Sequence, residues 1–455
     1  MSALTRNAFH DLPVDAVAPR RQPWVVWVLA MFLFVTFFAA TQDMDNPARW
    51  IDDGEADIAG WVGRVEQGQA QRQLGFLALG AFGALGIVLP SRHGRPAGID
   101  WVLMYLLVAT VAWSSASILW SIEPTFTAKR LVVFTSMWMA VAAIVKHFDL
   151  RDLAFCSLFY GVASLGIGVV AELKAGTLGA AAATGPWRMA GAMHPNHLGL
   201  TMSVMLLSAA YFFTQSYDRR RQAVFGSLMA VSLLVIYLTR SRTSLAAALV
   251  GLGVFTSLRL TFRQNLVLIG CALLPLVIGA FSYGSGAMGE VWEVALMGRK
   301  ESDVTTLTGR TDIWQFSIDH LWADPTRLFI GVGYNSFFTA ENTAAVSRYT
   351  GFTISEAHSA YLETWLNLGI AGLVCFTLTL VVGAGKWLAV GRTRRGRYRA
   401  DVALAVGLVA FAMVHGLVES AMSHAHFATL VVFTAIAIAA VRLRPIREAR
   451  QLEAA

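Results

Sequence analysis

The chain has 455 residues, of which 56% are apolar and only 14% are charged, and its mean hydropathy is +0.56. This composition excludes an ordinary soluble domain, in which about a quarter of the residues are charged. The net charge of +7 does not indicate nucleic-acid binding, because the basic residues concentrate between apolar runs, as they do in membrane proteins.

Twelve apolar runs are long enough to cross a bilayer, which takes about 20 mostly apolar residues because backbone amides cannot stay unpaired in hydrocarbon. We therefore predict an all-α, polytopic membrane fold with about twelve transmembrane helices. The predicted spans are 23–41, 73–90, 101–119, 129–146, 152–173, 196–214, 223–239, 243–258, 265–283, 366–388, 401–418 and 426–442.

The positions of Lys and Arg predict the orientation of the chain. Most of them fall in alternate connecting segments, including residues 219–221 and 386–399, and such basic segments stay on the cytoplasmic side. Residues 1–22 and 443–455 are therefore expected to be cytoplasmic tails of a membrane domain at 23–442. Residues 1–22 show no cleavage site, so the first span is expected to remain as an anchor.

Two outer loops are long enough to carry function. The loop at 42–72 is acidic, and its "DMD" at 43–45 and "DD" at 52–53 could hold a divalent cation, although a solvated acidic loop is the simpler interpretation. The loop at about 284–365 is long enough to form a small cap. Within it, apolar residues at helical spacing predict an amphipathic helix that ends at Asp324-Pro325, and a second helix is predicted from Ser355 to Gly369.

Arginines at the outer boundary are the strongest anomaly. Arg240 and Arg242 in "LTRSRTSL" lie between two apolar runs, where charge is costly unless a partner compensates it. A planar guanidinium suits phosphate, whereas contact with lipid headgroups is the alternative. Arg188 and Asn196 in "WRMAGAMHPNHLG" are further candidates at the entry to the sixth span.

Arg310 in "LTGRTDIW" and His358 in "SEAHSAYLETW" are candidates from the large loop. Arg310 could bind an anion, or it could pair with Asp312 or cap loop carbonyls. His358 is predicted in the first turn of a helix, whose dipole favours a neutral imidazole that can act as a general base. A structural histidine remains the alternative.

Three carboxyl or hydroxyl groups are candidates for supporting roles: Glu363 and Glu419 could orient the base or bind sugar hydroxyls, and Tyr361 lies two residues before Glu363. The sequence has no Walker-type loop, zinc-ligand spacing or nucleophile elbow. We therefore expect neither ATP hydrolysis, nor a cofactor, nor a metal site.

These motifs resemble those of the bacterial O-antigen ligase and polysaccharide polymerase superfamily, particularly its exopolysaccharide polymerases. The resemblance extends in order over about 120–372, through "WSIEPTFTAKR", "WRMAGAMHPNHLG", "TRSRTSL", "LTGRTDIW", "GVGYNSF" and "HSAYLETWLNLGIAG". It implies a membrane glycosyltransferase with a GT-C-like fold in the bacterial inner membrane, whose active site faces the periplasm. The implied partners are an undecaprenyl-diphosphate-linked glycan donor, a growing polysaccharide or lipid acceptor, and other components of polysaccharide export.

The resemblance also implies roles for individual residues. Arg242 and Arg310 would hold the diphosphate, His358 would activate the acceptor hydroxyl, and Arg188 and Arg240 would assist. The chain departs from the family at Ser359 and Ala360, where Asn and often Gly follow the histidine.

Two other functions remain open from the sequence. A ligase that transfers a glycan to lipid A core shares the donor chemistry. A transporter or flippase for lipid-linked sugars would instead want ionisable groups near the bilayer midplane and two similar halves, and neither pattern is evident.

Overall fold

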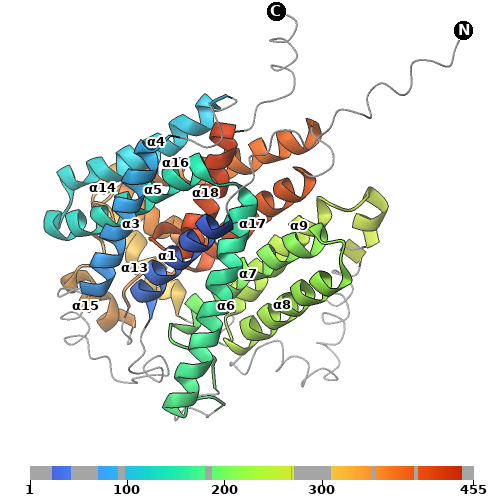
Figure 1. Ribbon diagram of the computed structural model, residues 1–455. Coiled ribbons are helices and arrows are strands. Elements are labelled where there is room, and N and C mark those ends of the chain that lie inside the picture. The colour runs from blue at the N-terminus through green and yellow to red at the C-terminus, as the bar shows by residue number, and fades with distance from the viewer. Residues whose placement is uncertain are drawn as a thin grey trace, which may run out of the picture.

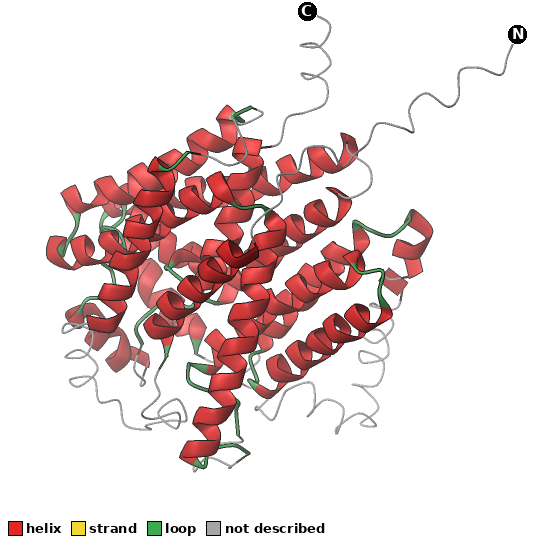
Figure 2. Cartoon of the chain, in the orientation of Figure 1, coloured by secondary structure: helices red, strands yellow, loops and turns green. Residues whose placement is uncertain are grey.

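A computed structural model describes residues 23–42, 70–90, 98–179, 187–267, 269–270, 309–350, 354–393 and 398–442. Within these ranges every regular element is a helix (Figures 1 and 2). Nine of the described helices are long and apolar enough to cross a membrane, and two shorter apolar helices, α9 and α18, accompany them. The prediction of a polytopic helical membrane protein is confirmed.

The long helices coincide with the predicted spans, except that most of the predicted span at 265–283 lies outside the described residues, as do both tails, residues 43–69 and residues 271–308. The helices are α1 (Pro23–Thr41), α3 (Ala70–Val88), α4 (Trp101–Ala116), α5 (Pro124–His147), α6 (Leu150–Ala175), α7 (Pro195–Gln215), α8 (Arg219–Leu238), α9 (Arg242–Ser257), α16 (Ala360–Thr393), α17 (Tyr398–Val418) and α18 (Phe427–Arg442).

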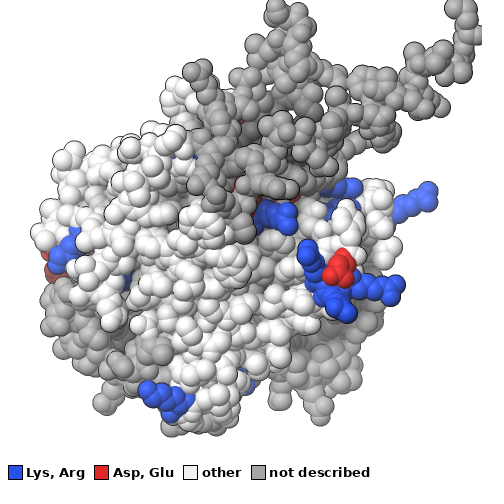
Figure 3. Space-filling model, in the orientation of Figure 1, with Lys and Arg blue, Asp and Glu red and all other residues white. Residues whose placement is uncertain are grey.

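The helix bundle has two chemically different ends. At one, which we call the basic end, α8 begins with Arg219–Arg221, Lys386 pairs with Asp100 at 2.5 Å, and Arg399 donates to the carbonyl of Leu258 at 2.9 Å. Figure 3 shows Lys and Arg gathered on this side, over α8 and the end of α9. The opposite end, the site end, holds the connections at 117–123, 187–194, 239–241, 309–350, 354–359 and 419–426.

Helices α3 and α5 lie unusually close because glycines line their contact. A Cβ added at Gly80, Gly83 or Gly86 would come within 2.7 Å of atoms of α5, in register with residues 136, 139 and 143. Small residues at this spacing let two membrane helices approach backbone to backbone. The offset of about 56 residues, continued towards the site end, places residue 72 beside residues 128–130.

A helical cap covers part of the site end (Figure 1, lower left). It consists of α13 (Arg310–Trp322), α14 (Pro325–Ile330) and α15 (Ala340–Thr350), and the predicted amphipathic helix ending at Asp324 is confirmed as α13. Asp324 begins the next helix, since its side chain accepts a hydrogen bond from the amide of Thr326 at 2.9 Å. The cap has a small core of its own, which includes Ile313, Leu321, Val332, Phe337, Val346 and Leu366.

Helix α16 is interrupted at Gly369, whose φ of 66° lies in the left-handed region. The interruption leaves backbone carbonyls available to the cap: Val332 donates to Leu366 at 3.0 Å and Gly333 donates to Asn367 at 2.9 Å. The predicted end of this helical segment at Gly369 is thus correct. Its predicted start at Ser355 is wrong, because α16 begins at Ala360.

The helix begins late because Ser359, rather than Ser355, acts as its N-cap. The Ser359 hydroxyl accepts from the amide of Leu362 at 3.4 Å, and its carbonyl accepts from the amide of Glu363 at 2.8 Å. His358 therefore precedes the helix, and it has a positive φ of 49°. A strained, non-helical backbone at a candidate catalytic residue is typical of functional sites.

Candidate functional site

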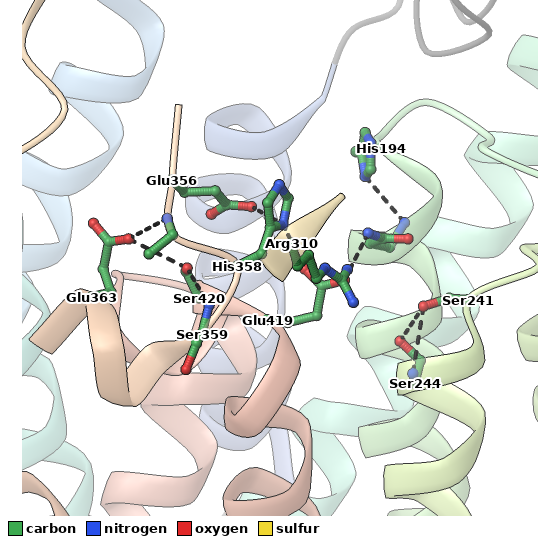
Figure 4. Close-up of polar contacts among 12 residues, drawn as sticks. His194, Ser241, Ser244, Arg310, Glu356, His358, Ser359, Glu363, Glu419 and Ser420 are labelled. Atoms are coloured by element: carbon green, nitrogen blue, oxygen red, sulfur yellow. Dashed lines mark hydrogen bonds and ion pairs between the residues drawn. The ribbon is translucent and has the colours of Figure 1, made fainter. Parts of the chain in front are cut away.

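Glu419 is the centre of a polar network at the site end. Its carboxylate lies between α17 and the short helix η3 (Ser420–Ser423), and the residue is 5% exposed. One oxygen, Oε1, accepts from Nη2 of Arg310 at 2.5 Å and from Nδ2 of Asn196 at 3.0 Å. The other, Oε2, lies 3.5 Å from Nδ1 of His358 (Figure 4). One carboxylate thus joins an arginine and a histidine that are distant in sequence.

The local folds explain how these groups meet. Arg310 begins α13 directly after Gly309, whose φ of 79° turns the chain into the helix. Asn196 lies in the first turn of α7, where its backbone N–H donates to Nδ1 of His194 at 3.2 Å. The alternative in which Arg310 pairs with Asp312 is not what the structure shows, since the guanidinium is bonded to Glu419.

Electrostatics favour a charged pair between Glu419 and His358. Burial alone would raise the pKa of Glu419, but the hydrogen bond with His358 and the charge of Arg310 lower that pKa to about 2. Burial alone would lower the pKa of His358, but the hydrogen bond to Glu419 and the charge of Glu356 outweigh it, so the pKa of His358 is raised.

The expectation that a helix dipole keeps His358 neutral is therefore wrong. The residue lies outside the helix, and two carboxylates face its Nδ1: Glu356 at 3.4 Å and Glu419 at 3.5 Å. A carboxylate that holds Nδ1–H fixes the imidazole so that Nε2 can accept a proton. A raised pKa also makes His358 a stronger base once it is deprotonated.

Arg188 belongs to the same network. Its Nη2 donates to Oδ1 of Asn196 at 3.1 Å and its Nε donates to the carbonyl of Thr239 at 3.0 Å. Asn196 in turn donates to Glu419, so an unbroken chain of hydrogen bonds runs from Arg188 to Arg310. Arg188 and Asn196 are thus connected to the candidate base, His358, through Glu419.

Arg240 and Arg242 lie at the rim of this network. Arg240 has a positive φ of 52° in the tight turn between α8 and α9, and its Nε donates to the carbonyl of Trp187 at 2.8 Å. Arg242 is the first residue of α9 and is half-buried. The hydrogen bonds around Glu419 approach Arg240 through Trp187 and Thr239.

Glu363 and Tyr361 do not contact His358. Glu363 is buried and accepts from the amide of Ala357 at 2.7 Å and from Nδ2 of Asn367 at 3.1 Å, so it shapes the segment before the histidine. The Tyr361 hydroxyl donates to the carbonyl of Met413 on α17 at 3.2 Å. Of the predicted supporting residues, Glu419 and Asn196 are those in contact with the predicted site.

A polar cavity of about 280 Å³ adjoins the network. Its lining residues are His194, Asn196, His197, Leu200, Glu356, His415, Glu419 and Ala421. His415 is 1% exposed, and within the described part of the chain neither of its ring nitrogens has a hydrogen-bond partner. Polar side chains around an open space can receive the oxygens of a substrate.

The same residues could also ligate a metal. Glu356, His358 and Glu419 each offer one ligand atom, and these atoms lie within 4.8 Å of one another. The donor set suits a divalent cation, but Arg310 already neutralises Glu419 and would oppose a second positive charge. Glu356 is not among the residues predicted from the motifs; its only sequence signal is its place two residues before His358.

Comparison with known proteins supports the family resemblance. No curated protein matches the chain. A family model described as O-Antigen ligase matches residues 227–377, which include Arg240, Arg242, Arg310 and His358. Arg188, Asn196 and Glu419 lie outside the matched range. Residues 227–377 are thus similar to the O-antigen ligase family, in agreement with the resemblance of the sequence motifs.

Proposed function

We propose that the protein is a membrane glycosyltransferase that moves a glycan from a polyprenyl diphosphate to a hydroxyl of another glycan at the outer face of the inner membrane. The family match supports an enzyme of the ligase and polymerase type. The observation that carries the proposal is the position of Glu419, which joins a phosphate-binding type of group, Arg310, to a base, His358.

In the proposed reaction, the acceptor oxygen attacks the anomeric carbon of the donor sugar. A bond forms between that oxygen and the carbon, and the bond between the carbon and the diphosphate oxygen breaks with its electron pair going to the diphosphate. Negative charge grows on the leaving group, so fixed guanidiniums that bind it more tightly in the transition state lower the barrier. We assign this role to Arg310 and Arg188, with Arg240 and Arg242 assisting.

The acceptor hydroxyl loses its proton to Nε2 of His358, while Glu419 holds Nδ1–H. Glu419 is a positioning residue in this scheme, since it acts through His358 and Arg310. A single displacement with one base predicts inversion at the anomeric carbon.

We favour polymerisation of exopolysaccharide repeat units, from undecaprenyl diphosphate, as the specific reaction. The motifs around Arg188, Arg310 and His358 resemble the polymerase branch most closely. The second candidate is transfer to lipid A core, which shares the donor site and differs in the acceptor. A transporter is disfavoured because it has no need for a base held by a buried carboxylate.

The test is an in vitro reaction of the purified protein with defined lipid-linked repeat units, resolved on a gel. We expect His358→Ala to abolish polymer and Arg310→Lys to reduce it strongly, because lysine keeps the charge but loses the bidentate fork. His147→Gln, at the basic end, is the matched control and should retain activity. Full activity of His358→Ala would disprove the base assignment.

Two further arms separate the alternatives. If lipid A core, rather than the repeat unit, accepts the glycan, the protein is a ligase. Activity in excess chelator would support a metal-independent reaction. Loss of activity that a divalent cation restores would instead assign Glu356, His358 and Glu419 to a metal.

A further inference from the structure

Two arginines outside the network around Glu419 lie side by side at the site end. Arg72 is in the first turn of α3 and Arg130 is in the second turn of α5, and the glycine-lined register of these helices places them together. Both are half-buried, and their charges lie close enough to interact. The guanidinium of Arg130 also lies 4.7 Å from the ring of Phe126.

Within the described part of the chain, neither guanidinium has a hydrogen-bonded or ion-paired partner. Two adjacent positive charges at the edge of a hydrocarbon layer repel each other and are costly unless an anion lies between them. The pair therefore has the character of an anion site whose ligand comes from outside the chain.

The pair faces residues next to the candidate active site. Burial, and then the charges of Arg130 and Arg72, lower the pKa of His424 to about 3. Burial raises the pKa of Tyr334, and the same two arginines oppose this effect. Nε2 of His424 lies 3.9 Å from Glu356, and Glu356 contacts His358. The arginine pair therefore approaches His358 through His424 and Glu356, whereas Arg310 approaches it through Glu419.

A largely apolar cavity of about 600 Å³ begins at Tyr334 and His424 and descends between α4, α5, α16 and α18. Its wall includes the aromatic and methionine side chains of Trp113, Phe134, Met137, Trp138, Phe376, Met422 and Phe433. A cationic pair at the outer ends of two helices, above an apolar cavity among them, matches the two parts of a lipid with a phosphate headgroup.

We propose that Arg72 and Arg130 form a second anion site, which binds the diphosphate of a second lipid-linked glycan while the first isoprene units of its chain enter the apolar cavity. The inference rests on the proposed function, because a polymerase must hold two lipid-linked substrates at once. A phosphorylated lipid A core would present the same chemistry, and it is separated from the first ligand in the test.

The first experiment counts bound lipid. Purified protein is mixed with undecaprenyl diphosphate and examined by native mass spectrometry. We expect two molecules on the unmodified protein, one on Arg72→Gln/Arg130→Gln and one on Arg310→Gln. Lys129→Gln removes an exposed cation beside Arg130 and should retain both. One molecule on the unmodified protein, or two on the double variant, would refute the second site.

A second pair of variants separates headgroup from tail. Arg72→Lys/Arg130→Lys keeps the charge and controls for loss of folding, and it should bind more weakly than the unmodified protein but more tightly than the glutamine variant. Ser114→Leu fills the cavity from α4, where Ser114 is 1% exposed. It should weaken the binding of undecaprenyl diphosphate at this site but spare the binding of inorganic diphosphate, which has no isoprenoid chain. Equal loss of both would contradict the assignment of the tail.

Competition and kinetics identify the ligand. Displacement by phosphatidylglycerol with equal affinity would show an ordinary headgroup contact, and selective displacement by lipid A core would indicate a ligase; either overturns the proposal. In the polymerisation assay, the double glutamine variant should raise the KM for the acceptor by at least about tenfold, with kcat within about twofold. If the unmodified protein makes no polymer, the proposed function fails; if it does and the KM is unchanged, only this inference fails.

Discussion

Glu419→Gln is the sharpest test of how the site operates. The substitution keeps the size of the side chain but removes the charge that holds Arg310 at 2.5 Å and His358 at 3.5 Å. A hydrogen bond to a charged group contributes about 1.5 to 3 kcal/mol. Loss of one such bond in the transition state lowers kcat/KM by roughly 10- to 150-fold. The measurement is the initial rate of polymer formation as a function of pH.

The pH profile gives a second, independent readout. His358 accepts a proton only when it is neutral, so the rate rises with pH through the pKa of His358, which lies above its ordinary value. In Glu419→Gln burial dominates, and the rise should move to lower pH. Glu341→Gln, an exposed carboxylate on α15, is the control. The reasoning would be refuted if Glu419→Gln kept its activity within about threefold of the unmodified protein and its rate rose at the same pH.

Two predictions concern stability. Gly369→Ala should destabilise the protein by at least about 1–3 kcal/mol in a thermal unfolding assay in detergent. The φ of Gly369 is 66°, and a Cβ there would lie 2.1 Å from the carbonyl oxygen of Phe329. Gly385→Ala, in the same helix with open space around it, is the control and should be neutral. Acidification from pH 7 to pH 5 should also lower the unfolding temperature: burial lowers the pKa values of His194 and His424 to about 3, so the unfolded chain, with pKa values of about 6.5, binds protons first. Stabilisation present above about pH 6.5 is thus lost below it, by about 2 kcal/mol per residue at pH 5, and replacing both with asparagine should reduce this dependence.

The helices could be predicted closely because an apolar run of about 20 residues has few other solutions in a membrane. The interruption at Gly369 was also accessible, since glycine tolerates the left-handed backbone. The start of α16 was not, because Ser355 and Ser359 are equally good caps by sequence. Tertiary contacts decide between them, as Glu363 accepts from the amide of Ala357 and holds the preceding segment outside the helix.

The site, like the helices, could be predicted from the sequence only where local motifs mark its residues. Arg188, Arg310 and His358 were accessible through local motifs. The central role of Glu419 was not, because its partners come from positions 196, 310 and 358, and only the folded bundle brings them together. The protonation of His358 was mispredicted because Glu419 reaches it only in the folded bundle, and because His358 lies outside the helix with Glu356 facing its Nδ1.

The break in α16 also bears on how related proteins can diverge. Carbonyls freed near Gly369 accept hydrogen bonds from the amides of residues 332 and 333, so main-chain atoms hold this part of the cap on α16. Such moorings are indifferent to most substitutions on the outward surface of α15. Descendants can therefore remodel that surface to admit different sugars while the imidazole stays where the reaction needs it.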